Sequence, residues 1–441
     1  MAASRALSAL LMGLLAAAAL PAVRGGGRAG RVLALIEADG LRRSHSQFFK
    51  GLEAAGLEVD IKTVGEGGLA LRSYDDAFYD HLVLFAPQAT ELGGSITKSE
   101  VLDFIDRGGN VLLALARGAS DLMRDLAAEV GVEVDAKGTA VFDHFSRQAA
   151  GGAEDATLVA SAAWFDSDAL FGGAARPEGP VLFRGVAQGV PAASELITVA
   201  LSGEATAYSH DPKKAMAEPP ALPVGGAAAL VSLVQARNNA RVAVAGSLDM
   251  FANEAFDAAV KLADGSKSFT KSGNRAFALA VALWTFQQRG VLEASAPRHR
   301  KVGGEAEPAL YRINDEVEFA IDIFEVNGGE RKPYGGDDVQ VSFVMLDPYL
   351  RQPLVPAGNG TFSLRFTVPD VYGVFKYAVD YRHAGYSYIA LQKVVPVRPF
   401  RHDEYERFLV AAYPYYASAA STMAAFFVLG WAYLYSPATT K

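Results

Sequence analysis

The last part of the chain is an uncharged, apolar stretch that is too long for a buried strand. No charged residue occurs between Phe408 and Thr440. A helix over residues 414–435 would be about 33 Å long at 1.5 Å per residue, which is enough to cross the hydrocarbon core of a bilayer. Aromatic residues mark both ends of this stretch, at the spacing of the two headgroup layers. They are Tyr413, Tyr415 and Tyr416 at one end and Trp431, Tyr433 and Tyr435 at the other. We therefore predict a transmembrane helix over residues 413–435, in preference to a buried helix of a soluble protein.

Small residues repeat along this predicted helix. Ala417, Ser421 and Ala425 follow one another at intervals of four residues. Small side chains at that spacing let a second helix approach closely, and such packing drives helix association in lipid. We therefore predict a partner-binding face at Ala417, Ser421 and Ala425. The alternative is an alanine-rich anchor that faces only lipid.

The other end of the chain has the features of a signal peptide. Arg5 precedes an apolar run over residues 6–20, and small residues surround a cleavage site near Gly25. Residues 1–25 as a signal peptide would carry the ectodomain into the lumen of the endoplasmic reticulum (ER) and leave residues 436–441 as a cytosolic tail. The flanking charges oppose this orientation, because Arg398, Arg401 and Arg407 lie on the luminal side. Long ectodomains are nevertheless translocated largely regardless of charge.

The composition excludes several classes of site. There are no cysteines, so disulfides, thiolate metal sites and cysteine nucleophiles are absent from the sequence. The net charge of −8 is modest and of mixed sign, which argues against nucleic-acid binding. The seven histidines never occur at the three- or four-residue spacing of a helical zinc site. We predict neither a metal site nor a cofactor.

Residues 26–295 alternate between strand and helix patterns. Apolar runs over residues 32–36, 57–64, 81–85 and 111–115 have strand length. Ser44 with Gln47 forms one predicted capping box, and Thr97 with Glu100 forms another. They predict helix starts after the first and the third of these runs. The runs 229–235 and 242–245 flank a turn and predict a hairpin. This alternation predicts a doubly wound parallel sheet covered by helices, with an irregular middle part over residues 142–224.

The period of the pattern changes to two beyond residue 300. Apolar residues alternate with others around Phe319, Phe343, Phe366 and Tyr377, and turn residues separate the runs. Such runs are typical of an antiparallel β-sandwich, of the immunoglobulin or fibronectin kind. We predict this sandwich over residues 300–398, followed by a charged neck over residues 399–412.

No segment supplies a recognisable catalytic constellation, and we predict no catalytic residue. The loop after the first strand, residues 37–40, holds one glycine and no dinucleotide-binding pattern, and neither a P-loop nor a nucleophile elbow occurs. The pair Asp166 and Asp168 resembles the D-x-D motif with which glycosyltransferases hold a metal–nucleotide sugar, but two such residues arise easily by chance. Asn359 begins the sequon Asn-Gly-Thr, which predicts N-glycosylation in a turn between two strands.

Several longer motifs are similar to those of one family. They are QARNNARV at residues 235–242, GSLD at 246–249, VMLDPY at 344–349, VPDVYGVFK at 368–376, RPF at 398–400, EYERF at 404–408 and AYPYYAS at 412–418. The chain resembles, from its first strand to its span, the non-catalytic single-span luminal subunit of eukaryotic oligosaccharyltransferase, the 48 kDa subunit family.

This resemblance implies an amidotransferase-like first domain that lacks the amidotransferase cysteine. It also implies that a separate polytopic subunit catalyses transfer, with ribophorin-type and small DAD-type subunits as further partners in the ER membrane. The tail departs from the family pattern, because residues 436–441 contain a single lysine where a lysine-rich retention signal is common. Retention would then depend on assembly of the complex.

Two hypotheses from different classes follow. The first is a non-catalytic scaffold subunit of the transferase complex. The second is a self-sufficient luminal enzyme or glycan-binding receptor that uses the cleft at the strand ends of the first domain. The lack of a nucleophile–base pair and the small-residue face of the span favour the first.

Overall fold

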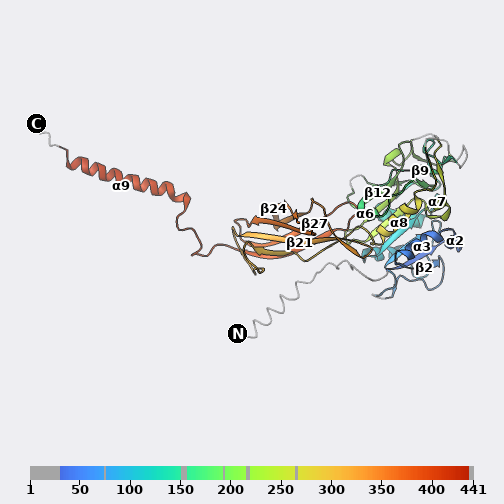
Figure 1. The fold of residues 1–441 in the computed structure, drawn as a ribbon, viewed down its shortest axis with the longest axis horizontal. Coiled ribbons are helices and arrows are strands. Elements are labelled where there is room, and N and C mark those ends of the chain that lie inside the picture. Colours follow the sequence, from blue (N-terminus) through green and yellow to red (C-terminus); the bar gives the residue numbers. More distant parts are fainter. Residues whose placement is uncertain are drawn as a thin grey trace, which may run out of the picture.

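A computed structural model describes residues 30–73, 76–149, 156–191, 194–214, 219–263 and 267–436. Three parts follow one another along its longest axis (Figure 1). They are an N-terminal lobe (residues 30–290), a second lobe built of two sheets (291–398) and the helix α9 (Tyr413–Leu434), which a neck (399–412) joins to the second lobe. The predicted signal peptide and all but the first residue of the predicted tail lie outside the described residues.

A nine-stranded mixed sheet forms the centre of the N-terminal lobe. Five of its strands are parallel neighbours, in the order β2 (Glu58–Thr63), β1 (Arg31–Ile36), β5 (His81–Phe85), β6 (Asn110–Ala114) and β15 (Arg241–Ala245). Four antiparallel strands complete it: β14 (Ala229–Gln235), β11 (Gln188–Gly189), β7 (Glu133–Val134) and β12 (Ile197–Ser202). The predicted hairpin is confirmed as β14 and β15. After their first residues, the central strands β5, β6 and β15 are apolar because both faces of the sheet are covered.

Helices cover the two faces of this sheet. The helices α3 (Ser46–Ala54) and α8 (Asn274–Thr285) contribute to one apolar core, through Phe48 and Phe277 among others. The helices α4 (Lys98–Asp106) and α5 (Asp121–Glu129) contribute to the core on the opposite face. The mixed α/β class predicted from the sequence is therefore present in the structure.

One of the two predicted helix caps is confirmed and one is wrong. The Thr97 side chain accepts a hydrogen bond from the backbone N–H of Glu100 and begins α4. Ser44 instead ends the short helix α2 (Gly40–Ser44), and α3 begins at Ser46 with His45 as its N-cap residue. The hydroxyl of Ser44 contacts the carbonyl of Gly40 and Nδ1 of His45, so it is not free to cap α3.

The irregular stretch predicted over residues 142–224 packs against the lobe as short elements. Its strands β11 and β12 join the central sheet, and its other strands form two small pairs, β9 (Val159–Ser161) with β10 (Val181–Phe183) and β13 (Tyr208–His210) with β8 (Ala140–Phe142). A short helix, α6 (Asp168–Phe171), lies between β9 and β10 in the chain. Their apolar side chains join the core beneath α3 and α8, so burial in the tertiary structure orders a segment without a clear periodic pattern.

Further short elements connect these parts. They are β3 (Arg72–Ser73), β4 (Asp76–Ala77), η2 (Gly225–Ala227), η3 (Asp249–Phe251), α7 (Asn253–Asp257), β16 (Val260–Lys261), β17 (Ser268–Phe269) and, in the neck, η4 (Val410–Ala412).

Two sheets make up the second lobe, and one apolar core joins them. The first sheet contains β18 (Val291–Ala294), β19 (Arg298–Lys301), β21 (Glu316–Asn327), β22 (Glu330–Pro333), β25 (Val355–Pro356) and β26 (Thr361–Thr367). The second has the order β20 (Tyr311–Arg312), β28 (Ile389–Arg398), β27 (Gly373–Tyr381), β23 (Gln340–Met345) and β24 (Asp347–Pro353). All pairs are antiparallel except β20 with β28. The predicted period of two reflects alternation between this core and solvent, as the burial of Val317, Phe319 and Ile321 along β21 shows.

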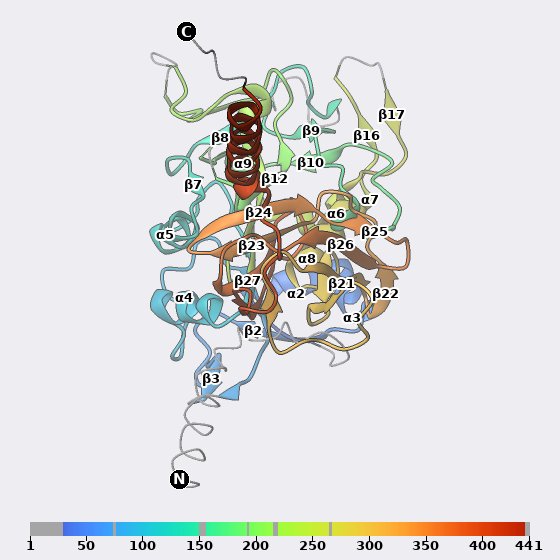
Figure 2. The same ribbon diagram turned by 90° about the vertical axis from the view of Figure 1, so that its left-hand side faces the viewer.

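The helix α9 stands apart from both lobes, and none of its residues is buried. Figure 2 looks along the molecule from this helix toward the two lobes. Together with the turn before it, α9 is the one helix of the described residues long and apolar enough to cross a membrane, over Val410–Leu434. Pro414 lies in its first turn, where a missing backbone N–H carries no penalty.

Candidate functional site

The two lobes meet at a joint, built by the hairpin of β14 and β15 and by the loop between β27 and β28. Asn239 lies at the tip of the hairpin with a φ of 65°. Its side-chain oxygen accepts a hydrogen bond from the backbone N–H of Tyr388 at 2.7 Å, and its amide nitrogen donates to the Tyr388 carbonyl at 3.0 Å. The indole of Trp284 also donates to the carbonyl of Gly385 at 2.6 Å. Side chains of the N-terminal lobe thus bind the backbone of the second lobe directly.

Arg241 holds the segment that leads from one lobe to the other. Its guanidinium is fully buried and donates to the carbonyls of Trp284 (2.8 Å), Arg289 (2.6 Å) and Gly290 (2.6 Å). It also lies 4.5 Å from the centre of the Trp284 ring. Burial lowers the pKa of Arg241 to about 9, which leaves the group charged at neutral pH. The buried cation thus binds one carbonyl near the end of α8 and the two carbonyls directly before β18 (Val291–Ala294).

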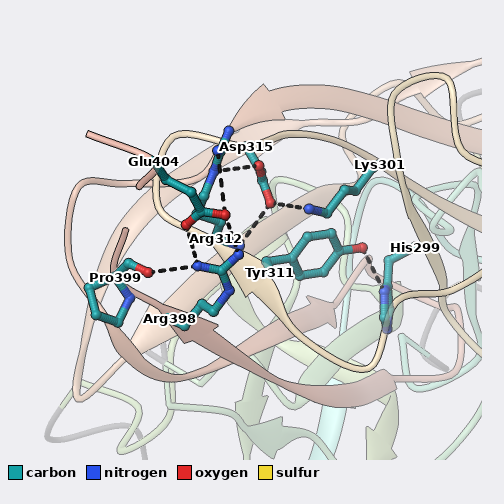
Figure 3. A network of polar contacts seen from close by, with 8 residues as sticks. All are labelled: His299, Lys301, Tyr311, Arg312, Asp315, Arg398, Pro399 and Glu404. Carbon is teal, nitrogen blue, oxygen red and sulfur yellow. Dashed lines mark hydrogen bonds and ion pairs between the residues drawn. The ribbon is translucent and has the colours of Figure 1, made fainter. Parts of the chain in front are cut away.

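A second polar network fixes the neck to the far end of the second lobe (Figure 3). Arg398, the last residue of β28, binds both carboxylate oxygens of Glu404, at 2.5 and 2.7 Å. The backbone N–H of Arg401 donates to the same carboxylate at 2.8 Å. These bonds fold residues 399–404 back onto the lobe. We call this arrangement the neck clamp.

Neighbouring side chains support the neck clamp. Arg312 of β20 lies 4.0 Å from Glu404 and stacks over the ring of Phe400, 5.1 Å from its centre. Asp315 pairs with Lys301 at 2.6 Å and with Arg312 at 3.3 Å. The hydrogen bond of 2.8 Å between Tyr311 and the buried ring of His299 holds β20 from the opposite side (Figure 3). Burial raises the pKa of Tyr311 to about 12, so this phenol stays protonated in the physiological range.

The neck clamp has a defined pH range. The hydrogen bonds from Arg398 and from the backbone of Arg401 lower the pKa of Glu404 to about 2. A depressed carboxylate pKa stabilises the folded state above the ordinary value of about 4.5, and the contribution is lost as the pH falls from there towards 2. The clamp is therefore closed at neutral and mildly acidic pH.

Opening the clamp should expose the neck to protease. We expect Glu404→Gln to increase severalfold the rate of tryptic cleavage after Arg401 and Arg407, because the amide has one acceptor oxygen and no charge, so the two-oxygen ion pair with Arg398 is lost. The fragments are measured by mass spectrometry during limited proteolysis of the full chain. Glu406→Gln is the matched control, since this exposed carboxylate lies on the same segment without being part of the clamp. Equal cleavage rates in the two variants would contradict the role of Glu404.

The predicted partner face lies on α9. Ala417, Ser421 and Ala425 are exposed. The hydroxyl of Ser421 donates to the carbonyl of Ser418 at 2.9 Å, so the polar group is satisfied within the helix. The three small side chains thus form a shallow strip on the helix surface.

The predicted glycosylation residue, Asn359, is exposed in the turn between β25 and β26. Its side-chain oxygen accepts a hydrogen bond from the backbone N–H of Thr361, and the Thr361 hydroxyl donates to Asp322. Gly358 and Gly360 have φ values of 82° and 88°, which an L-residue would adopt only with strain. The sequon is therefore presented on a well-defined surface turn.

The D-x-D pair is occupied by a cationic side chain. Arg176 binds Asp166 at 2.5 Å and Asp168 at 2.8 Å, and the Ser167 side chain caps α6. No group of three or more potential metal ligands occurs among the residues that the structure describes. The pair is explained by an ion pair at a helix start.

A hollow of about 520 Å³ lies beyond the carboxyl ends of β5 and β6. Its lining consists of Gln88, Thr90, Gly118, Ser120, Asp121, Leu122 and Lys137. The Ser120 hydroxyl donates to the carbonyl of Ala89 at 2.6 Å and accepts from the N–H of Met123, so it serves as a helix cap. The loop over residues 37–40 does not line the hollow, although Glu37 accepts a bond from the backbone of Gln88. Asp121 and Lys137 could serve as bases, but the Ser120 hydroxyl is engaged by the backbone and bonds to neither, so the described lining shows no nucleophile–base pair.

The sequence did not predict the contacts of Asn239 and Arg241 at the joint or of Glu404 in the neck clamp. Arg241 and Asn239 belong to the motif at residues 235–242, and Glu404 belongs to the motif at residues 404–408. The length of both motifs was a signal, but their contacts join positions far apart in the chain. An arginine beside an Asn-Asn turn predicts a solvated side chain, and only the tertiary structure shows that it is buried.

These features together define a class of protein. A two-lobed body with an internal joint, carried by a clamped neck on one candidate membrane helix, is the architecture of a membrane-anchored protein with a single span.

Comparison with known proteins gives the family. The family model of the OST48 N-terminal domain matches residues 27–288, and that of the OST48 middle domain matches residues 299–437. The chain belongs to the OST48 family.

Relatives across eukaryotes agree with this assignment. The dolichyl-diphosphooligosaccharide–protein glycosyltransferase 48 kDa subunit of Arabidopsis thaliana is 42% identical over 406 residues. The subunits of the same name from Danio rerio and Caenorhabditis elegans are 39% and 37% identical over 409 residues. Each comparison covers 92% of this chain and 92% of the relative. The structure of a ThuA-like protein from Parabacteroides merdae is 14% identical, covers 59% of this chain and 91% of its own and has a TM-score of 0.32, too low to define a shared fold.

Proposed function

We propose that this chain is a non-catalytic scaffold subunit of the oligosaccharyltransferase complex. The observation that carries the proposal is the identity of 37–42% to 48 kDa subunits along nearly the whole chain. The joint at Arg241 and the neck clamp at Glu404 support a scaffold, because they connect the N-terminal lobe to the membrane helix through specific polar contacts. The complex transfers a dolichol-linked oligosaccharide to asparagine in sequons of nascent chains.

The finer parts of the proposal concern fold, orientation and partners. The N-terminal lobe is amidotransferase-like and lacks the cysteine nucleophile, and the two sheets of the second lobe form a β-sandwich around their common core. The protein is a type I membrane protein of the ER, with both lobes in the lumen and residues 436–441 in the cytosol. The polytopic catalytic subunit, ribophorin-type subunits and the small DAD-type subunit are its partners.

The isolated chain should transfer no glycan. Catalysis requires groups positioned to act together on the reacting atoms, and the hollow at the strand ends shows no nucleophile–base pair among the described residues. The test is a transfer assay with the purified full chain, lipid-linked oligosaccharide and an acceptor peptide, with the intact complex as the positive control. Turnover by the chain alone would contradict the scaffold role and support the alternative of a self-sufficient luminal enzyme or glycan-binding receptor.

Asn359 should carry an N-glycan in the mature protein. The exposed turn and the proposed luminal orientation make its side chain accessible to the transferase. Mass spectrometry of the peptide that contains Asn359, before and after glycosidase treatment, measures the occupancy. The Asn359→Gln variant controls for other modifications. An entirely unmodified Asn359 in protein from its native membrane would contradict this prediction.

A further inference from the structure

The hairpin between β23 and β24 has an unusual residue at its tip. Leu346 is 99% exposed and has a φ of 64°. Hairpin tips with positive φ normally use glycine, asparagine or aspartate, because a side chain such as leucine is strained there. The same leucine also leaves its entire apolar surface in water. Neither property helps the lobe to fold, which indicates that the tip meets something outside it.

Other exposed apolar side chains lie beside this tip. The first residue of β27 packs directly against the hairpin, since a Cβ on Gly373 would collide with the sulfur of Met345. Tyr372, next to it, is 66% exposed, and Val374 is 64% exposed. Val374 pairs with Pro396 of β28, so this surface continues on the outer face of the sheet. We call Leu346, Tyr372 and Val374 the apolar tip.

The apolar tip lies at the end of the second lobe that faces α9. Gly373, at the start of β27, pairs with Val397, and β28 ends one residue later at Arg398, where the neck begins. The opposite end of the same two strands is the loop over residues 382–388, at the joint with the N-terminal lobe. The tip and the joint are thus at opposite ends of the lobe.

The neck clamp keeps this end of the lobe close to the membrane. Because Glu404 binds both Arg398 and the backbone of Arg401, residues 399–404 add little to the reach of the neck. The remaining segment, residues 405–412, spans at most about 28 Å when fully extended. It exposes Phe408, Leu409 and Val410, apolar side chains that favour the membrane interface and shorten the gap further.

We propose that the apolar tip contacts the lipid headgroup layer of the bilayer that α9 crosses. Leucine and valine supply apolar area for the upper acyl region, and the phenol of Tyr372 suits the boundary between lipid and water. Asp347 and Asp370 flank the tip in the sequence and keep its insertion shallow, because carboxylates avoid the hydrocarbon core. This contact rests on the proposed single-span topology. With α9 it would give the ectodomain a second point of support on the membrane.

The absence of cysteine from the chain allows a direct test with single-cysteine variants. The full-length variants Leu346→Cys and Tyr372→Cys carry an environment-sensitive fluorophore in phosphatidylcholine nanodiscs, with doxyl-labelled lipid or aqueous iodide as the quencher. Ala384→Cys, exposed at the joint end of the same lobe, is the negative control, and Val428→Cys in α9 reports on the span itself. We expect lipid quenching at positions 346, 372 and 428 and iodide quenching alone at 384.

A substitution at the tip separates membrane contact from stability. Leu346→Asn replaces leucine with a residue that tolerates positive φ, so the melting temperature should stay the same or rise. The lipid quenching of a fluorophore at position 372 should fall in this variant. A drop in melting temperature would instead mean that Leu346 serves folding and would overturn the proposal.

The remaining outcomes distinguish the tip from the span. Lipid quenching at 428 with iodide quenching alone at 346 would overturn the tip contact and leave the proposed function intact. No lipid quenching at 428 would overturn the single-span topology and the tip contact together. Protection of position 346 only after partner subunits are added would assign the tip to a protein partner and also overturn the lipid proposal.

Discussion

Replacing Arg241 with alanine is expected to lower the free energy of unfolding by about 3–5 kcal/mol, among the largest effects of any single substitution in this chain. The change removes three hydrogen bonds from a charged donor to the carbonyls of Trp284, Arg289 and Gly290. It also leaves a cavity beside the Trp284 ring. Relief of the buried charge offsets part of this loss, but the three carbonyls would then lie buried without their donor.

Thermal unfolding of the full chain in mild detergent measures this effect. A loss of this size corresponds to a fall of about 6–20 °C in the melting temperature of a lobe of this length. Arg237→Ala is the matched control, because Arg237 is exposed on the same hairpin. Arg241→Met keeps most of the side-chain volume and removes the donors, so it should also destabilise. If Arg241→Met melts at the wild-type temperature, packing and not hydrogen bonding accounts for the role of Arg241.

Replacing Ser421 with leucine is expected to release the chain from the complex while α9 still inserts into the membrane. Ala417, Ser421 and Ala425 leave a shallow strip on α9, and a helix packed there would be forced away by a bulky side chain. Overpacking of this kind costs about 1–3 kcal/mol. That cost corresponds to a loss of about 5- to 150-fold in the association constant. Insertion is preserved because leucine enters lipid more favourably than serine.

Co-purification with the other subunits in mild detergent measures the release, and extraction of membranes with alkali confirms insertion. Ala419→Leu is the matched control, since it adds a leucine in the same part of α9 on nearly the opposite face of the helix. Equal co-purification of Ser421→Leu and Ala419→Leu would mean that the span serves only as an anchor. The two lobes alone would then hold the subunit in the complex.

Features that depend on nearby residues were predicted well from the sequence. The length and lack of charge of the terminal stretch predicted α9, and the structure has this helix over Tyr413–Leu434. Alternating apolar residues predicted β21, and Thr97 with Glu100 predicted the start of α4. The capping box at Ser44 failed because a competing bond to the carbonyl of Gly40 engages the hydroxyl. Helix and strand patterns are local properties, and they are visible wherever no such competing contact exists.

The candidate sites depended on contacts between distant parts of the chain. The bond between Asn239 and Tyr388 joins residues 149 positions apart, and Arg241 binds a carbonyl 49 positions away. Arg176 neutralises the aspartates that alone suggested a metal motif.

The sequence by itself thus determined the membrane helix, the two kinds of lobe and the family resemblance, because periodicity and long motifs are properties of adjacent residues. Only the tertiary structure decided that an arginine is buried at the joint, that Glu404 folds the neck back and that Leu346 stands exposed at the end of the second lobe where the neck begins. Burial and ion pairing are set by which distant segments meet, and no local pattern encodes that.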